Sequence, residues 1–211
     1  MKRIELLSCP MDVATMDETV DVIAQRVEKK IFTQHVVVNV AKVVNMRKDL
    51  VLNESVCACE IINIDGMGVV LGARMLGHEI PERVAGIDLF HHLLQMSAER
   101  GFPVFLLGAR NEIVLEARRR VEELYPNLIV AGCHHGYFWD DEAAVVEKIH
   151  ESGARLLFVA ITSPKKENFI NKWKDQLGVD FVMGVGGTFD VVAGKVKRAP
   201  LWMQEYGLEW V

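Results

Sequence analysis

Residues 181–200 read F-V-M-G-V-G-G-T-F-D-V-V-A-G-K-V-K-R-A-P. An apolar run meets three glycines, Gly184, Gly186 and Gly187, and an apolar pattern resumes behind them. This order indicates a buried strand, a tight turn and a short helix. Because glycine has no Cβ, the backbone N–H groups of such a turn can approach a ligand closely, and the helix start behind it favours phosphate. The alternative is a glycine turn that serves only tight strand-to-helix packing.

The remainder of the chain repeats the same unit of a strand followed by a helix. Apolar segments predict strands at 4–7, 35–40, 61–64, 104–107, 128–131 and 156–161. Helical spacing predicts helices behind the capping box at 15–18 and at 41–49, 66–77, 86–100, 111–124, 140–151 and 164–176. Apolar strands that alternate with helices are typical of a parallel sheet covered on both faces. We therefore predict an α/β fold with a Rossmann-like, mostly parallel sheet, in one domain spanning residues 1–211.

The composition excludes several classes of protein. Half of the 211 residues are hydrophobic, which suffices for a substantial core. A formal net charge of -5 and a pI near 5.8 argue against a nucleic-acid-binding protein, which needs a basic face. We find neither an apolar run of roughly 20 residues nor a signal-peptide core, so we expect a cytoplasmic protein. The four cysteines lack C-x-x-C spacing, and we expect buried free thiols.

Polar residues and glycines gather where the predicted strands end. They are Asn39, Asp65, Gly108, the 134–138 stretch, the 163–167 stretch and the glycine turn. In parallel α/β sheets, ligands bind beyond the carboxyl ends of the strands. These segments are therefore expected to border one shared cleft.

The motifs of several other enzyme classes are incomplete or absent. The glycine turn departs from the dinucleotide fingerprint G-x-G-x-x-G, because Phe189 stands at the position of the third glycine. A Rossmann oxidoreductase is therefore a weaker alternative, and we expect no cofactor. His134 and His135 have no carboxylate or cysteine partner at helical spacing, although Cys133 adjoins them, so we expect no metal there.

Several segments, taken in order, resemble the WecG/TagA/CpsF family of glycosyltransferases over almost the whole chain. They are 38–42 (V-N-V-A-K), 65–68 (D-G-M-G), 81–86 (P-E-R-V-A-G), 134–138 (H-H-G-Y-F), 164–167 (P-K-K-E), 184–190 and 197–200 (K-R-A-P). The resemblance implies an inverting enzyme that moves a sugar, of the N-acetylmannosamine type, from a UDP-sugar donor to a polyprenyl-diphosphate-linked acceptor. Such an enzyme builds bacterial cell-surface polysaccharide or teichoic acid at the inner face of the cytoplasmic membrane.

The resemblance assigns Asp65 as the catalytic base, and a carboxylate at a strand end beside the cleft can take a proton from the acceptor hydroxyl. The alternative for Asp65 is a helix cap before Gly66. Asn39 would hold a sugar through its amide, unless it is an ordinary turn residue. Arg83 matches a family arginine that is important for activity, and its alternative is a surface ion pair with Glu82 or Glu79.

The leaving UDP carries negative charge that must be neutralised. The sequence contains no D-x-D triplet, so we expect metal-independent transfer in which positive side chains and backbone N–H groups hold the diphosphate. Lys166, Gly186 and Gly187 are the candidates, and Glu167 is the next candidate for the base. The resemblance places Gly108, Tyr137 and Asp190 around the uracil, although Tyr137 could equally be a rim aromatic.

Three departures from the family pattern affect the expected function. Val37 stands where some members have threonine, and Lys166 stands where they often have glutamine. The sequence ends at Val211, where members usually continue into an arginine-rich tail that touches the membrane. A catalytically silent UDP-sugar-binding module is therefore the alternative function. We also expect a homo-oligomer, because apolar residues gather near the end: Leu201, Trp202, Met203, Tyr206, Leu208 and Trp210.

Overall fold

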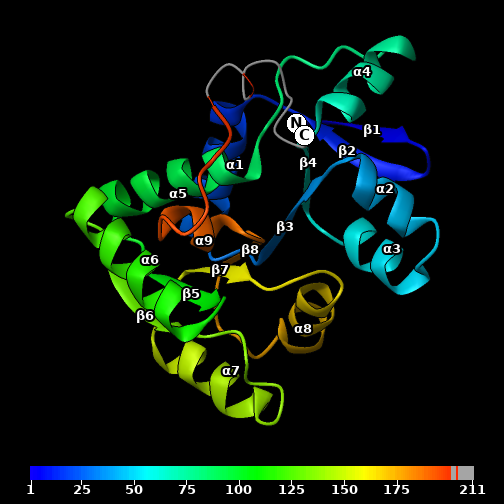
Figure 1. Ribbon diagram of the computed structural model, residues 1–211. Helices are drawn as coiled ribbons and strands as arrows, with labels where there is room; N and C mark the ends of the chain where they lie inside the picture. The colour runs from blue at the N-terminus through cyan, green and yellow to red at the C-terminus, as the bar shows by residue number, and fades with distance from the viewer. Residues whose placement is uncertain (201–202, 204–211) are drawn as a thin grey trace.

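A computed structural model describes residues 1–200 and Met203 of the chain. Its centre is a sheet with the strand order β1-β2-β4-β3-β8-β7-β5-β6 (Figure 1). The strands are β1 Lys2–Leu6, β2 Cys9–Val13, β3 Thr33–Val38, β4 Ile61–Ile64, β5 Val104–Gly108, β6 Val130–His134, β7 Leu156–Ala160 and β8 Phe181–Gly184. Strands β1 and β2 pair antiparallel, and the other neighbours pair parallel. The predicted Rossmann-like α/β fold with a mostly parallel sheet is confirmed.

Helices cover both faces of this sheet (Figure 1). They are α1 Met16–Glu28, α2 Val40–Met46, α3 Leu50–Cys57, α4 Met67–Met75, α5 Gly86–Arg100, α6 Asn111–Leu124, α7 Glu142–Glu151, α8 Lys165–Trp173 and α9 Thr188–Val192. Successive strand residues point to opposite faces, so Leu106 of β5 belongs to the core that also contains residues of α1, α5, α6 and α9, whereas Leu107 belongs to the core that contains residues of α7 and α8. Helices α2, α3 and α4 continue this second face over β3 and β4.

Most predicted elements are present, and the differences have local causes. Strand β6 runs to His134, further than the predicted 128–131, because an edge strand that pairs only with β5 tolerates Gly132 and Cys133 in place of apolar residues. Its register also shifts opposite Val104 and Phe105. Strand β2 was not predicted because Pro10 interrupts its strand pattern. Helix α3 was not predicted because its apolar residues do not mark one face: Leu50 is exposed, whereas Leu52 and Val56 are buried.

The chain leaves β8 toward one face of the sheet, whereas it leaves both neighbouring strands toward the other. Helix α9 follows β8 and packs in the core with α5 and α6. Helices α2 and α8 follow β3 and β7 and pack in the cores of the opposite face. Where neighbouring strands lead to opposite faces, a crevice opens beyond their carboxyl ends. The glycine turn after β8 therefore has a crevice on each side.

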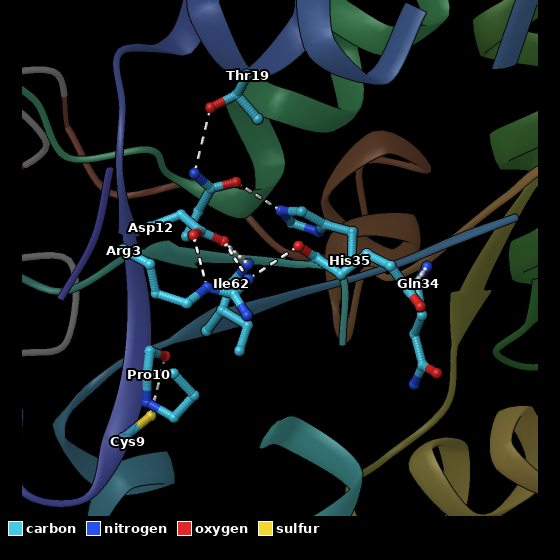
Figure 2. Close-up of polar contacts among 10 residues, drawn as sticks. Arg3, Cys9, Pro10, Asp12, Thr19, Gln34, His35 and Ile62 are labelled. Carbon is cyan, nitrogen blue, oxygen red and sulfur yellow. Dashed lines mark hydrogen bonds and ion pairs between the residues drawn. The ribbon is translucent and has the colours of Figure 1, made fainter. Parts of the chain in front are cut away.

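A polar network joins the hairpin, the sheet and α1 (Figure 2). Arg3 donates two hydrogen bonds of 2.8 Å to the carboxylate of Asp12, which also accepts the backbone N–H of Ile62. On β4, Asn63 donates to Thr19 of α1 and accepts a bond of 2.8 Å from Nε2 of His35. This pairing places the proton of the neutral imidazole on Nε2 and leaves the buried Nδ1 without a partner in the described part of the chain.

The next two observations concern the expected oligomer and the membrane. Leu201, Trp202, Tyr206, Leu208 and Trp210, on which the expected oligomer rests, lie outside the described residues. Across residues 1–200, none of the helices combines the length and the apolar character needed to cross a bilayer.

We predict that His35 makes the protein less stable in acid. Burial lowers the pKa of His35 from 6.5 to about 4, and the bond to Asn63 opposes this only in part. The unfolded chain therefore binds more protons between these two values, so stability falls as the pH drops from 6.5 toward 4, by on the order of 3 kcal/mol. His35→Gln, followed by chemical denaturation at several pH values, should flatten this part of the profile.

His92→Gln is the matched control, because His92 is exposed on α5. It should retain the wild-type profile. Equal pH dependence in the wild type and His35→Gln would show that His35 does not contribute this term.

Candidate functional site

Two pockets adjoin the glycine turn and share Gly186 and Gly187. The β7-side pocket has a volume of about 360 Å³ and is lined by Ala109, Arg110, Gly136, Tyr137, Trp139, Ala160, Ile161, Thr162, Lys165, Gly186, Gly187 and Asp190. The β3-side pocket has a volume of about 430 Å³ and is lined by Val37, Asn39, Lys42, Asp65, Gly86, Ile87, Lys166, Gly184, Val185, Gly186, Gly187, Thr188, Val191, Lys197, Arg198 and Ala199. A ligand that crosses the turn can occupy both.

Each glycine of the turn meets a different physical requirement. Gly186 has φ +53°, a left-handed conformation that glycine adopts without cost. A Cβ on Gly184 would lie 2.5 Å from Cε of Lys166, so glycine leaves room for that side chain to cross the end of β8. A Cβ on Gly187 would meet no atom within 4 Å. The missing Cβ of Gly187 therefore opens space for a ligand and is not required by packing.

The carboxylate of Asp65 lies in the β3-side pocket, directly after β4. Its Oδ2 accepts the backbone N–H of Gly86 at 3.0 Å, and its Oδ1 lies 3.9 Å from Nη1 of Arg83. The N-cap of α4 is Gly66, and Asp65 instead contacts the first residue of α5. The side chain is 26% exposed, so it can still reach a ligand in the pocket.

Asn39 lies beside Asp65 in the same pocket. Its Oδ1 accepts the backbone N–H of Lys42 at 2.9 Å and so caps α2. A Cβ on Gly66 would lie 3.2 Å from Cβ of Asn39, which shows how closely the two strand ends approach. Val37 completes this wall, because its side chain lines the pocket near Gly86.

Two lysines share one glutamate at the back of the β3-side pocket. Nζ of Lys42 lies 3.0 Å from Oε1 of Glu167, and Nζ of Lys166 lies 3.4 Å from the same oxygen. Burial lowers the pKa of Lys166, and the Lys42 ammonium lowers it further. Burial alone would raise the pKa of Glu167, but the two ammonium groups hold it below its usual value. Glu167 is 3% exposed and is not among the lining residues of either pocket.

The segment after α9 forms another wall of the β3-side pocket. Lys197, Arg198 and Ala199 line it. The guanidinium of Arg198 donates bonds of 2.5 and 2.9 Å to the two carboxylate oxygens of Asp88 on α5. Burial opposes the charge of Asp88, but these bonds hold its pKa below the usual value. This pair fixes the segment against α5.

The β7-side pocket contains the aromatic residues. Tyr137 is 67% exposed. Nζ of Lys165 lies 5.1 Å from the centre of the Trp139 ring. Asp190 lines the same pocket from α9. Gly108 lies behind the wall: its φ is +126°, and a Cβ there would meet the carbonyl oxygen of Ala160 at 2.3 Å. Gly108 therefore permits close packing of β5 and β7, and its neighbour Ala109 reaches the pocket.

The structure brings most of the predicted site residues to the two pockets. Asn39, Asp65 and Lys166 line the β3-side pocket, Tyr137 and Asp190 line the β7-side pocket, and the glycines line both. Arg83 reaches the site through Asp65, whereas Gly108 and Glu167 support it from behind. Within residues 1–200 and Met203, no group of three or more His, Cys, Asp or Glu side chains is placed to hold a metal ion.

Several pocket residues were not predicted as site residues. Lys42 belongs to the V-N-V-A-K segment and follows Asn39 by one helical turn, so that spacing could have identified it. Arg110 follows a strand end, which was also a usable signal.

A larger hollow of about 770 Å³ lies elsewhere, lined by Lys2, Val13, Glu18, Arg74, Gly77, His78, Glu79, Ile80 and Pro81. None of the predicted site residues lines this hollow.

Comparison with known proteins shows the family of the chain. The model of the glycosyl transferase WecG/TagA/CpsF family matches residues 4–211. The chain belongs to this family. The resemblance of its segments to the WecG/TagA/CpsF glycosyltransferases is thereby confirmed.

Curated relatives in the WecG/TagA/CpsF family carry a specific name. The N-acetylglucosaminyldiphosphoundecaprenol N-acetyl-beta-D-mannosaminyltransferase of Bacillus subtilis (strain 168) is 35% identical over 146 residues, which cover 69% of this chain and 57% of that protein. The protein of the same name from Bacillus spizizenii (strain ATCC 23059 / NRRL B-14472 / W23) is 35% identical over 167 residues, which cover 79% and 63%. The aligned part of this chain thus spans about 60% of the length of these relatives.

We predict that Gly187→Ala blocks the ligand while preserving the fold. The φ of Gly187 is -78°, which alanine adopts freely, and the new Cβ meets no protein atom. The free energy of unfolding should change by less than about 1 kcal/mol, because a poorer N-cap and a less flexible unfolded chain oppose each other. Affinity for UDP, measured by calorimetry, should fall about 10-fold or more, the effect of roughly 1.4 kcal/mol of lost contact.

Gly72→Ala is the control, since a Cβ on Gly72 of α4 also meets no atom, and Gly72 lines neither pocket. It should bind UDP as the wild type does. Undiminished UDP binding by Gly187→Ala would remove the turn from the binding surface.

Proposed function

We propose that the chain is an inverting glycosyltransferase that moves a sugar from a UDP-sugar to a polyprenyl-diphosphate-linked sugar. Family membership supports the reaction class, and the names of the relatives support N-acetylmannosamine as the donor sugar and a lipid diphosphate as the acceptor carrier. One observation carries the proposal. A carboxylate, Asp65, lies in a pocket lined by lysines, and the glycine turn joins that pocket to a second, partly aromatic one.

The two pockets suit the two parts of a nucleotide sugar. In this proposal the uridine occupies the β7-side pocket, where Tyr137 packs on the base and Asp190 hydrogen-bonds to the nucleoside. The diphosphate crosses the turn, where the missing side chains of Gly186 and Gly187 allow backbone N–H groups to approach it. The donor sugar then lies in the β3-side pocket, where the amide of Asn39 can hold its hydroxyl groups.

Asp65 acts as the base in this arrangement. As the acceptor oxygen attacks the anomeric carbon, its proton passes to the Asp65 carboxylate. The bond between the anomeric carbon and the phosphate oxygen breaks, and its electron pair leaves with UDP. Because attack and departure occur on opposite faces of the sugar, the configuration inverts. Nη1 of Arg83 lies 3.9 Å from Oδ1 of Asp65, close enough to attract the carboxylate and hold it in the pocket.

Positive side chains stabilise the departing UDP in this proposal, which makes the reaction metal-independent. Lys166 lies next to the turn, and Lys197 and Arg198 line the same pocket. Charge-assisted hydrogen bonds from such groups are about twice as strong as neutral ones. The lipid carrier of the acceptor would hold the enzyme at the inner face of the cytoplasmic membrane as a peripheral protein.

A UDP-sugar-binding module without catalysis is the alternative, and one contact favours it. The Oδ2 atom of Asp65 already accepts the N–H of Gly86, as a purely structural cap would. A capping role and a base role make different demands on the carboxylate. A cap requires only an acceptor oxygen, whereas a base must take up a proton.

We predict that Asp65→Asn abolishes most of the transfer and preserves UDP binding. Asparagine keeps an oxygen for Gly86 but cannot accept the proton of the acceptor, so transfer should slow by about 10²–10⁴-fold. The assay measures UDP release from UDP-N-acetylmannosamine with a lipid-diphosphate-linked N-acetylglucosamine acceptor, using the full-length protein in EDTA. Wild-type turnover in EDTA tests the metal independence in the same experiment.

Asp49→Asn makes the same chemical change at a helix cap outside the two pockets, where Asp49 accepts the N–H of Leu52. It should leave transfer at the wild-type rate. Wild-type turnover by Asp65→Asn would assign the base elsewhere, and loss of wild-type activity in EDTA would contradict the metal-independent leaving group.

A further inference from the structure

The β3-side pocket holds more lysine than its nearby carboxylates can neutralise. Lys42 comes from the first turn of α2, and Lys166 comes from the first turn of α8. Their ammonium groups meet at the same Oε1 atom of Glu167, at 3.0 and 3.4 Å. Two positive charges thus share one negative charge, and all three side chains are at most 13% exposed.

Other cations at the site have different surroundings. Arg198 forms a bidentate pair with Asp88, and Arg83 lies near Asp65. The remaining cations of the two pockets, Lys197, Arg110 and Lys165, are exposed, so water and salt screen their charges. The surplus positive charge that is shielded from solvent therefore lies at Lys42 and Lys166.

The surplus positive charge lies in the pocket that contains the glycine turn. The side chain of Lys166 crosses directly over Gly184, where a Cβ would displace it. Both lysines line the β3-side pocket, which shares Gly186 and Gly187 with the β7-side pocket. A ligand that extends from the β7-side pocket across the turn therefore enters the pocket that Lys42 and Lys166 line.

We propose that Lys42 and Lys166 form a two-lysine clamp for the second phosphate of a nucleoside diphosphate. The clamp rests on the proposed function and adds Lys42 to the residues that bind the donor. An anionic phosphate relieves the repulsion between the two ammonium groups, which Glu167 alone offsets only in part. In the transfer reaction the same contact stabilises the charge that develops on the departing diphosphate.

The experiment compares UDP with UMP, which lacks the second phosphate. Lys42→Met removes the ammonium group and keeps a long apolar side chain. Calorimetry should show that its affinity for UDP falls by about 10- to 100-fold, the loss expected for a hydrogen bond to a charged group, while its affinity for UMP is unchanged. Lys48→Met is the matched control, because Lys48 lies just beyond α2, is exposed and lines neither pocket.

If Lys42→Met does not fold, Lys42→Gln makes the same test, since glutamine can still donate to Glu167 without a charge. Equal losses for UDP and UMP would overturn the clamp, and so would unchanged UDP binding. A loss confined to a donor with a carboxylated sugar, or to the lipid-diphosphate acceptor, would assign the lysines to another anion and also overturn it. Failure of the wild type to bind any uridine nucleotide would instead contradict the proposed function.

Discussion

The direction in which the chain leaves β8 is the constraint on which the site depends. Both neighbours of β8 lead to helices on one face of the sheet, whereas β8 leads to α9 on the other. Crevices therefore open on both sides of a single turn, and the same few backbone atoms must line both of them. Gly186 provides the left-handed backbone, Gly184 admits the Lys166 side chain, and Gly187 leaves open space.

The two pockets differ in the chemistry of the residues that line them. Lysine and arginine line both pockets, but Asp65 lies in the β3-side pocket, and the aromatic rings of Tyr137 and Trp139 lie in the β7-side pocket. Glu167 is shared by two lysines, and Asp88 pairs with Arg198. These carboxylates hold the cations in place, and at Glu167 one negative charge faces two positive charges. This arrangement suits a ligand with an aromatic end and an anionic middle, which is the chemistry of a nucleotide sugar.

The fold and the strand-end residues were predictable because they follow from local patterns. Apolar strands alternating with helices define a parallel sheet, and the carboxyl ends of such strands meet at one edge, so Asn39 and Asp65 were expected together. The supporting contacts were not predictable. The bond from Gly86 to Asp65, and the sharing of Glu167 by Lys42 and Lys166, join segments far apart in the sequence. No periodicity within one element reports such pairings.

The central claim is that one ligand spans both pockets across the glycine turn. Hydrogen exchange with saturating UDP tests it most directly, because exchange reports protection of individual backbone amides. The account predicts that UDP slows exchange at residues 109–110 and 136–139 of the β7-side pocket, at 185–188 of the turn, and at 39–42 and 166 of the β3-side pocket. Protection confined to residues 74–81 at the separate hollow, or no protection at the turn, would contradict it.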